Sequence, residues 1–188
     1  MLIKYQTKLD GIKYMKNKIN ADILISALGV ALFPPIWAVL APHIGVTTGA
    51  VALICAGLYA ANGGKKENAP KISVGILLGD FWAVLALWLM EIMQFNQDAE
   101  LFITLFVLGG LAVLISAVFD KFIFCPSWLC GWAIGLTILS PLGYLNIGTV
   151  PIEIAVSMLV GVWYVGVFVD AMHGAVIKLI ENRKENNK

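Results

Sequence analysis

The sequence predicts an all-α membrane protein with six transmembrane helices arranged as three hairpins, plus a short N-terminal amphipathic helix at the membrane interface. Composition is the first reason. The chain of 188 residues is 60% hydrophobic and 13% charged, with a mean hydropathy of +0.85, whereas roughly half of the residues in a soluble domain are apolar. Charge placement is the second reason. The thirteen Lys and Arg residues lie in four short patches, separated by three stretches that contain none: residues 20–64, 72–120 and 122–177.

Each stretch without basic residues is long enough for two membrane spans, because one span needs about 20 apolar residues. Basic patches mark the cytoplasmic side of a membrane protein. We therefore expect both termini and the loop at residues 63–70 to be cytoplasmic. The opposite loops, residues 42–48, 94–100 and 143–152, contain no Lys or Arg. This distribution requires an even number of spans.

The chain divides into an N-terminal segment, a membrane domain and a tail. Residues 1–20 carry apolar side chains at helical spacing with lysines on the other face, which is typical of a helix lying on a membrane surface; a partly ordered tail is the alternative. Residues 21–178 form the six-span membrane domain, and residues 179–188 form a polar cytoplasmic tail. We expect no cleaved signal sequence, because the first hydrophobic run is itself a full span.

The six spans are expected at residues 22–41, 46–62, 72–93, 101–119, 127–144 and 150–176. The first span contains Pro34 and Pro35. Proline removes a backbone donor and clashes with the preceding turn, so we predict a kink or break there. Residues 27–35 also resemble residues 133–141. This similarity hints at a repeated hairpin whose copies run in the same direction through the membrane.

Three segments of the chain resemble a known family. They are residues 36–64 with Tyr59 and the terminal Gly63-Gly64, residues 79–83 with the sequence Gly-Asp-Phe-Trp-Ala, and residues 126–137 at the start of the fifth span. The chain is similar here to the bacterial inner-membrane family called domain of unknown function 1097, over residues 24–169. The resemblance implies a small multi-spanning protein of the bacterial inner (plasma) membrane and transfers no established activity.

Asp80 is the first candidate for a functional residue, because it lies near the middle of the third span. A carboxylate at that depth is costly and usually faces a cavity or the interior of the helix bundle. No Lys or Arg lies within the predicted spans to neutralise it. Either Asp80 serves a proton-linked or cation-attracting site, or it is a protonated group that packs two helices together.

The proline break supplies further candidates for a substrate path. Broken helices line the substrate sites of many transporters because unwound backbone offers fixed dipoles, although proline kinks without that role are common. Deep indoles also form good walls for small organic solutes, and plain packing is the alternative for them. The path or binding residues that we consider are Asp80, Trp37, Trp82, Pro34, Pro35, His43, Thr47, Thr48, Tyr59 and Trp132.

Small residues predict close helix packing within or between protomers. Glycine lets helix backbones approach one another, and this approach drives association in lipid. The candidates are a pair at four-residue spacing in the third span, two adjacent residues in the fourth and a second spaced pair in the fifth. They are Gly75, Gly79, Gly109, Gly110, Gly131 and Gly135.

The sequence contains no motif that predicts an enzyme, a nucleic-acid site, a metal site or a cofactor. We therefore expect a small-solute channel or transporter for neutral or weakly acidic or basic metabolites. At this size one protomer encloses a narrow path at best, so a homo-oligomer in the lipid bilayer is expected. The alternative is a non-transporting integral membrane assembly or anchor protein. A continuous polar path through one protomer would discriminate between the two.

Overall fold

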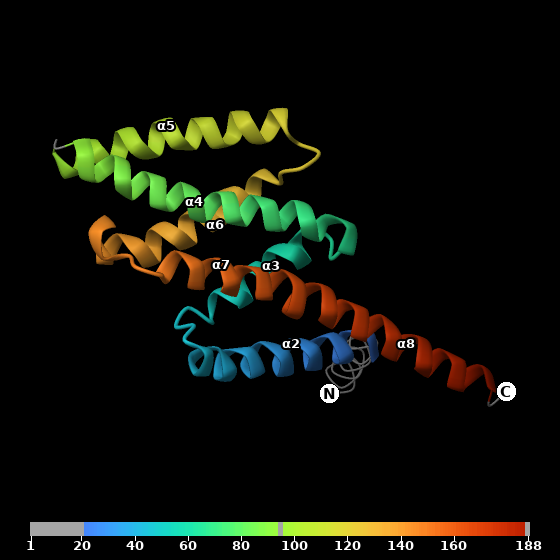
Figure 1. The fold of residues 1–188 in the computed structure, drawn as a ribbon. Helices are drawn as coiled ribbons and strands as arrows, with labels where there is room; N and C mark the ends of the chain where they lie inside the picture. The colour runs from blue at the N-terminus through green and yellow to red at the C-terminus, as the bar shows by residue number, and fades with distance from the viewer. Residues whose placement is uncertain (1–20, 94–95, 187–188) are drawn as a thin grey trace, which may run out of the picture.

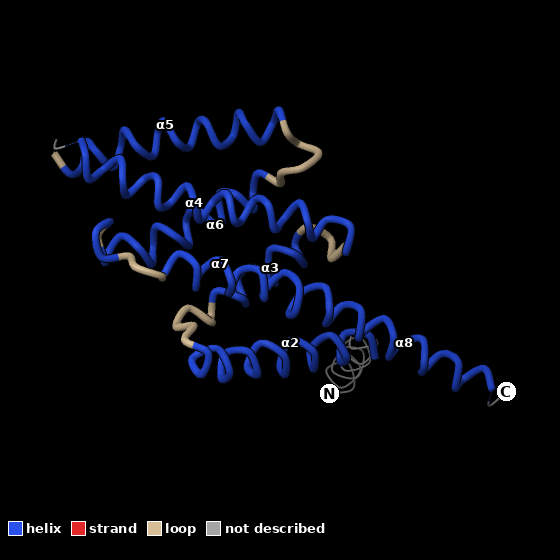
Figure 2. Tube along the Cα trace, in the orientation of Figure 1, coloured by secondary structure: helices blue, strands red, loops and turns tan. Residues whose placement is uncertain are grey.

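The computed structural model describes residues 21–93 and 96–186, and this part of the chain is helical, with no strand. The predicted interfacial helix at residues 1–20 lies outside the described residues. Figures 1 and 2 show the arrangement of the helices. In chain order they are α2 (Ala21–Leu40), α3 (Val51–Ala61), α4 (Ala69–Met93), α5 (Gln97–Val118), α6 (Cys125–Leu139), α7 (Val150–Val160), the π-helix η5 (Gly161–Phe168) and α8 (Val169–Asn186). Short 3-10 turns lie at Ala41–Ile44, Lys66–Asn68, Ser140–Leu142 and Tyr144–Asn146.

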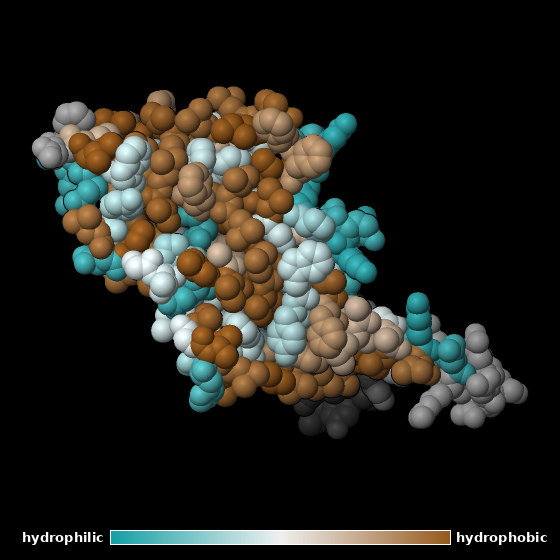
Figure 3. All heavy atoms as spheres, in the orientation of Figure 1, coloured by the Kyte–Doolittle hydropathy of each residue, from teal (hydrophilic) through white to brown (hydrophobic). Residues whose placement is uncertain are grey.

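The structure confirms an all-helical membrane protein. Within the described residues five helices are long and apolar enough to cross a bilayer: Ile23–Ile44, Lys66–Met93, Gln97–Val118, Cys125–Leu142 and Val150–Leu179. Figure 3 shows hydrophobic side chains over most of one face, with hydrophilic ones concentrated toward the two ends of the helices. The predicted second span is shorter than expected, because α3 has only 11 residues. It is about 16 Å long, roughly half of a hydrocarbon core.

The two prolines of α2 do not break it. Pro34 and Pro35 both lie inside one helix that runs from Ala21 to Leu40, so the chain does not break there, and the kink that we gave as the other possibility stays a prediction. The turn that leaves the helix comes later, at Ala41–Ile44, and Gly45 follows it in a left-handed conformation with φ of 81°. At the other end of the chain, α8 continues to Asn186 and includes most of the predicted tail.

The most extensive packing in the molecule joins α4 to α6. Gly75 of α4 lies against Ser127, and Gly79 lies against the backbone of Trp128 and Gly131. Gly135 lies against Ala83. These contacts advance along both helices together, so α4 and α6 are parallel. A Cβ on Gly79 would overlap the backbone of α6, which means that glycine permits this approach.

A second parallel pair joins α3 to η5 in the same manner. Gly161 lies against the backbone of Ala52 and the side chain of Cys55, and Gly166 lies against the ring of Tyr59. The hydroxyl groups of Thr48 and Ser157 meet at 3.2 Å just before these contacts. In Figure 1, α3 and α7 run in the opposite direction to α4 and α6.

These two pairs belong to two three-helix units of like arrangement. In the first unit α2, α3 and α4 follow one another, and in the second α5, α6 and α7 with its continuation do so. The third helix of each unit packs on the second helix of the other unit: α4 packs on α6, and α7 with η5 packs on α3. The first helix of each unit also packs on the third helix of the other: α5 packs on α4, and α2 packs on η5 and α8. The third helices α4 and α7 meet between them.

The sequence carries a trace of this relation. Residues 72–82 read ISVGILLGDFW and residues 154–164 read IAVSMLVGVWY. The two segments share Ile, Val, Leu and Gly at matching positions, and the shared glycines, Gly79 and Gly161, make the equivalent backbone contacts. The repeat expected between residues 27–35 and 133–141 does not coincide with these units, because α2 is the first helix of one unit and α6 is the second helix of the other. The first of these segments lies in α2 at the edge of the molecule, and most of the second lies in the buried helix α6.

A glycine substitution tests the close approach of α4 and α6. We predict that Gly79→Ala lowers the free energy of unfolding by about 1–3 kcal/mol, because the methyl group must displace backbone. The matched control is Gly174→Ala on α8, where no atom lies within 4 Å of an added Cβ; it should leave stability unchanged or raise it by up to about 1 kcal/mol. Thermal unfolding in detergent measures both. Equal stability of the two variants would contradict the packing described.

Candidate functional site

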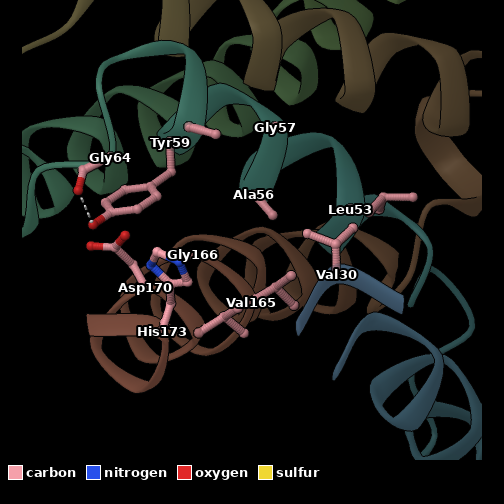
Figure 4. Close-up of a pocket in the computed structure, with 12 residues that line it drawn as sticks. Val30, Leu53, Ala56, Gly57, Tyr59, Gly64, Val165, Gly166, Asp170 and His173 are labelled. Atoms are coloured by element: carbon pink, nitrogen blue, oxygen red, sulfur yellow. Dashed lines mark hydrogen bonds between the residues drawn. The ribbon is translucent and has the colours of Figure 1, made fainter. Parts of the chain in front are cut away.

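A cleft of about 450 Å³ lies between α2, α3 and the helix formed by η5 and α8. Its walls are apolar or small over most of their length, and its polar groups gather at one end (Figure 4). Val30 closes it on the α2 side. The other lining residues are Leu53, Ala56, Gly57, Tyr59, Ala60, Gly64, Val165, Gly166, Val169, Asp170 and His173.

Local backbone geometry fixes Tyr59 at the polar end of the cleft. The chain turns after α3 through Gly63 and Gly64, which have φ of 89° and 60°, values that favour glycine. The turn brings the Gly64 carbonyl back to Tyr59, whose hydroxyl donates to it at 2.9 Å. On the opposite side the ring packs directly on Gly166 of the π-helix. Tyr59 is therefore held from two sides and is only 3% exposed.

Asp170 and His173 complete the polar end from α8. They are one turn apart on the same helix, and both point toward the hydroxyl end of Tyr59 in Figure 4. Asp170 is close enough to Tyr59 for the two side chains to interact electrostatically. The π-helix places these residues, since it precedes α8 directly. Such wide turns are rare and occur frequently at functional sites.

Aromatic side chains hold α2 against the rest of the cleft. The ring of Phe33 meets Tyr164 and Phe168 edge-on, with centroid distances of 5.8 and 5.6 Å. Tyr164 and Phe168 stack on one another at 5.9 Å. One turn earlier, Gly29 lies against Val169. The α2 wall therefore rests on η5 and α8.

The equivalent position in the second unit is filled. The contacts of Gly161 and Gly79 align Ala52 with Trp128 and Cys55 with Gly131. The next residue of each helix is then Ala56 in the first unit and Trp132 in the second. Trp132 is 7% exposed, and its ring would lie 3.6 Å from a Cβ added to Gly109 of α5. An indole thus occupies in one unit the place that a methyl group leaves open in the other.

Comparison with known proteins assigns the chain to a family. A family model described as a protein of unknown function (DUF1097) matches residues 27–174. The chain belongs to the DUF1097 family. No curated protein and no solved structure matches it. In this DUF1097 chain the match includes every residue that lines the cleft.

Of the residues predicted to form a solute path, only Tyr59 lines this cleft. Asp80 lies inside the protein, as predicted, and is 6% exposed. It sits in the α4–α6 interface, where its Oδ1 would be 3.4 Å from a Cβ on Gly135. That oxygen has no hydrogen-bond partner among the described residues. Asp80 and Tyr59 therefore occupy different places in the fold.

The predicted tryptophans are also dispersed. Trp37 donates to the Gly49 carbonyl at 3.0 Å and ties α2 to the turn before α3. Trp82 donates to the Leu108 carbonyl of α5 at 3.0 Å, and its ring meets that of Trp128 edge-on at 5.0 Å. Trp37 and Trp82 do not flank one cavity, because they contact different helices. Trp82 and Trp132 instead fill the space between α4, α5 and α6.

Of the remaining predicted residues, His43, Thr47 and Thr48 lie at the end of the molecule opposite Asp170, whereas Pro34 and Pro35 lie within α2. Glu153 at the start of α7 accepts hydrogen bonds from the backbone and hydroxyl of Thr47, at 3.0 and 2.9 Å. Together with the Thr48–Ser157 contact, this ties the beginning of α3 to α7. His43 is exposed in the turn after α2. Pro34 is half-buried, and Pro35 lines a shallow groove on the outer side of α2.

Sequence reasoning missed Asp170 and His173, which form the polar end of the cleft. A signal was present: an acidic residue and a histidine three positions apart near the end of a predicted span lie on one helix face. Their partner Tyr59 lies more than a hundred residues earlier, and only the parallel packing of α3 on η5 brings it there. Within the described residues no three His, Cys, Asp or Glu side chains converge on a metal-binding arrangement.

Substitution of Asp80 tests whether its carboxyl group stabilises the α4–α6 interface. We predict that Asp80→Asn leaves the unfolding temperature unchanged or raises it, because no described group pairs with the carboxyl and a buried charge is costly. Leu87→Asn, which introduces the same amide at another buried position of α4, should lower it by several degrees. Thermal unfolding in detergent provides the measurement. A marked loss of stability in Asp80→Asn would reveal an interaction that depends on the acid.

Proposed function

We propose that this protein passes a small solute across the bacterial inner membrane, as a channel or a carrier, and that the cleft beside Tyr59 is its solute-binding site. The observation that supports this proposal most directly is the difference between the surroundings of α3 and α6, the second helices of the two units. Beside Ala56 of α3, an open cleft of about 450 Å³ lies between helices of both units, and the equivalent place beside α6 is filled by Trp132. Small, mostly apolar cavities with a few converging polar groups are the usual form of small-molecule sites.

The proposal includes six spans, with α3 as the sixth membrane element. The turn before α3 extends it, because Val51, Ala52 and Leu53 donate to the carbonyls three residues earlier at 3.0–3.2 Å. Hydrogen bonds to the carbonyl three residues earlier are those of a 3-10 helix, so the chain already follows a tight helical path before α3 begins. A short helix with an irregular start is tolerated in a membrane where protein covers it, and here α7 and η5 do so. Hairpins are then formed by α2 with α3, α4 with α5, and α6 with α7.

The antiparallel relation of the two units supports a transport function. With three spans in each unit, the second unit is inserted in the opposite sense to the first. Many secondary transporters are built from such inverted repeats, and their substrate sites involve interrupted helices. In this chain the interrupted elements are the short α3 and the π-helix η5, and both line the cleft.

The cleft chemistry supports neutral or weakly acidic or basic solutes. No Lys or Arg is among the described residues that line it, so these residues offer no fixed positive charge to a strong anion. A homo-oligomer is part of the proposal. Gly110 and many apolar side chains of α5 face outward in the monomer, and glycine on an exposed helix face suits close contact with a second copy.

A non-transporting role as an assembly or anchor protein is the second candidate. One observation favours it: at the end opposite Asp170, Thr47 donates to Glu153, and the hydroxyl groups of Thr48 and Ser157 bond to one another. These polar residues line neither the cleft nor the shallow groove on the outer side of α2. A carrier therefore has to rearrange this end, whereas an anchor does not.

Cysteine labelling tests the orientation. In a variant with Cys55, Cys125 and Cys130 replaced by alanine, we expect an impermeant thiol reagent to label a cysteine at Gln97 in sealed cells. It should not label one at Asn68 until the membrane is opened, because the lysine patches mark the cytoplasmic side. Labelling of the Asn68 position in sealed cells would contradict the proposed orientation, because it would place the loop at residues 63–70 outside the cell.

A cavity-filling substitution tests the function. We predict that Ala56→Trp abolishes solute flux in proteoliposomes by placing an indole where Trp132 lies in the other unit. The control is Ile54→Trp on the same helix, which is 51% exposed and does not line the cleft. Its flux should equal that of the wild type. The assay uses a panel of small neutral, weakly acidic and weakly basic metabolites. Absence of flux for the entire panel in the wild type would favour the anchor role.

A further inference from the structure

We propose that the polar end of the cleft binds a small organic amine in its cationic form, with the hydrocarbon part of the molecule lying along α2 and α3. This inference rests on the proposed function in one respect: it takes the amine to be the class of solute that the protein transports. The binding itself can be measured without any flux.

The charge of the lining residues gives the first argument. Among the described residues that line the cleft, Asp170 is the only carboxylate, and none is Lys or Arg. A single carboxylate at the end of an apolar cleft attracts a cation and repels an anion. His173 lies beside it and, together with Tyr59 and Asp170, completes the set of titratable side chains that line the cleft.

Hydrogen-bonding capacity gives the second argument. The hydroxyl hydrogen of Tyr59 is already donated to the Gly64 carbonyl, so the phenol oxygen offers only acceptor lone pairs to a ligand. The Asp170 carboxylate also offers only acceptors. An ammonium group has three donors and no acceptor, and it complements these two oxygens. A carboxylate or phosphate ligand would find a donor only on the His173 imidazole, and it would have to approach the negative charge of Asp170.

The shape of the cleft gives the third argument. Beyond its polar end the cleft is lined by Val30, Leu53, Val165 and Val169, which suit a short hydrocarbon body. A second apolar groove of about 180 Å³ between α2 and α8 shares Val169 and His173 with the cleft. A longer chain attached to the amine therefore has a continuous apolar surface to follow. The same ammonium chemistry can come from a soluble alkylamine or from the headgroup of an aminophospholipid.

Binding of hexylamine to the purified full-length protein tests the proposal. Calorimetric titration in detergent should show saturable binding of hexylamine near neutral pH and none of hexanoate, with hexanol markedly weaker than the amine. Asp170→Asn should weaken hexylamine binding at least about tenfold, since hydrogen bonds to charged groups contribute about 1.5–3 kcal/mol. Asp120→Asn, at an exposed turn outside the cleft, should bind like the wild type. Ala56→Trp should also lose binding through steric exclusion.

The source of the amine is distinguished in lipid nanodiscs. If an aminophospholipid occupies the cleft, hexylamine binds in phosphatidylcholine discs but is excluded in phosphatidylethanolamine discs. If the ligand is a soluble amine, it binds equally in both. Both results support the amine site.

Equal binding of hexylamine and hexanol, or unchanged hexylamine binding in Asp170→Asn, would overturn the proposal. If Asp170→Asn fails to fold, hexylamine binding that persists in Ala56→Trp has the same consequence. The fate of the transport function is separate. Amine binding without flux of any solute would overturn transport alone, and flux of another solute through a protein that does not bind hexylamine would overturn the amine site alone.

Discussion

The fold depends on two places where helix backbones touch without side chains between them. Gly79 rests on the backbone of α6, and Gly161 rests on the backbone of α3. Between apolar helices in lipid there is little hydrophobic driving force, so close packing and hydrogen bonds must supply the cohesion. Both contacts join helices from different three-helix units, with the result that neither unit can form its core alone. The polar ties that accompany them, Thr47 to Glu153 and Trp163 to Ser73 at 3.0 Å, also cross between units.

The two helix pairs thus share one pattern of backbone contacts, but the space beside α6 is filled with side chains and the space beside α3 is open. Around α6 the large rings of Trp82, Trp128 and Trp132 fill the space left by the glycine approach, and two of these indoles lack a partner for their N–H group among the described residues. Around α3 the corresponding space is bordered by Ala56, Gly57 and Ala60. The first arrangement stabilises a rigid half of the molecule by packing. The second leaves room for a ligand at the cost of that packing, and it is there that the polar residues of α3 and α8 converge.

Composition and the spacing of lysines were sufficient to predict an all-helical membrane protein, because both depend only on transfer between water and lipid. The burial of Asp80 was predictable for the same reason. The cleft was not, since Tyr59 and Asp170 are brought together by a parallel helix pair that no local pattern specifies. Pro34 and Pro35 led us to expect a kink or break, yet α2 continues as a helix through both, and the adjacent Phe33 packs on Tyr164 and Phe168. The length of α3 was overestimated, because the predicted span began at Val46 whereas the helix begins at Val51. Val46, Thr47 and Thr48 lie in the turn that precedes it.

The partners of α2 have a consequence for biosynthesis. This first helix packs mainly on α8 and η5, and these elements begin only at Gly161. A ribosome adding about 5–20 residues per second needs on the order of ten seconds to make the intervening chain. Throughout that interval α2 resides in the membrane without its final neighbours, with Phe33 and Gly29 facing lipid or a chaperone. Completion of the cleft is therefore a late, post-insertion event, and truncation before Gly161 removes both η5 and α8 and so leaves α2 without its main packing partners.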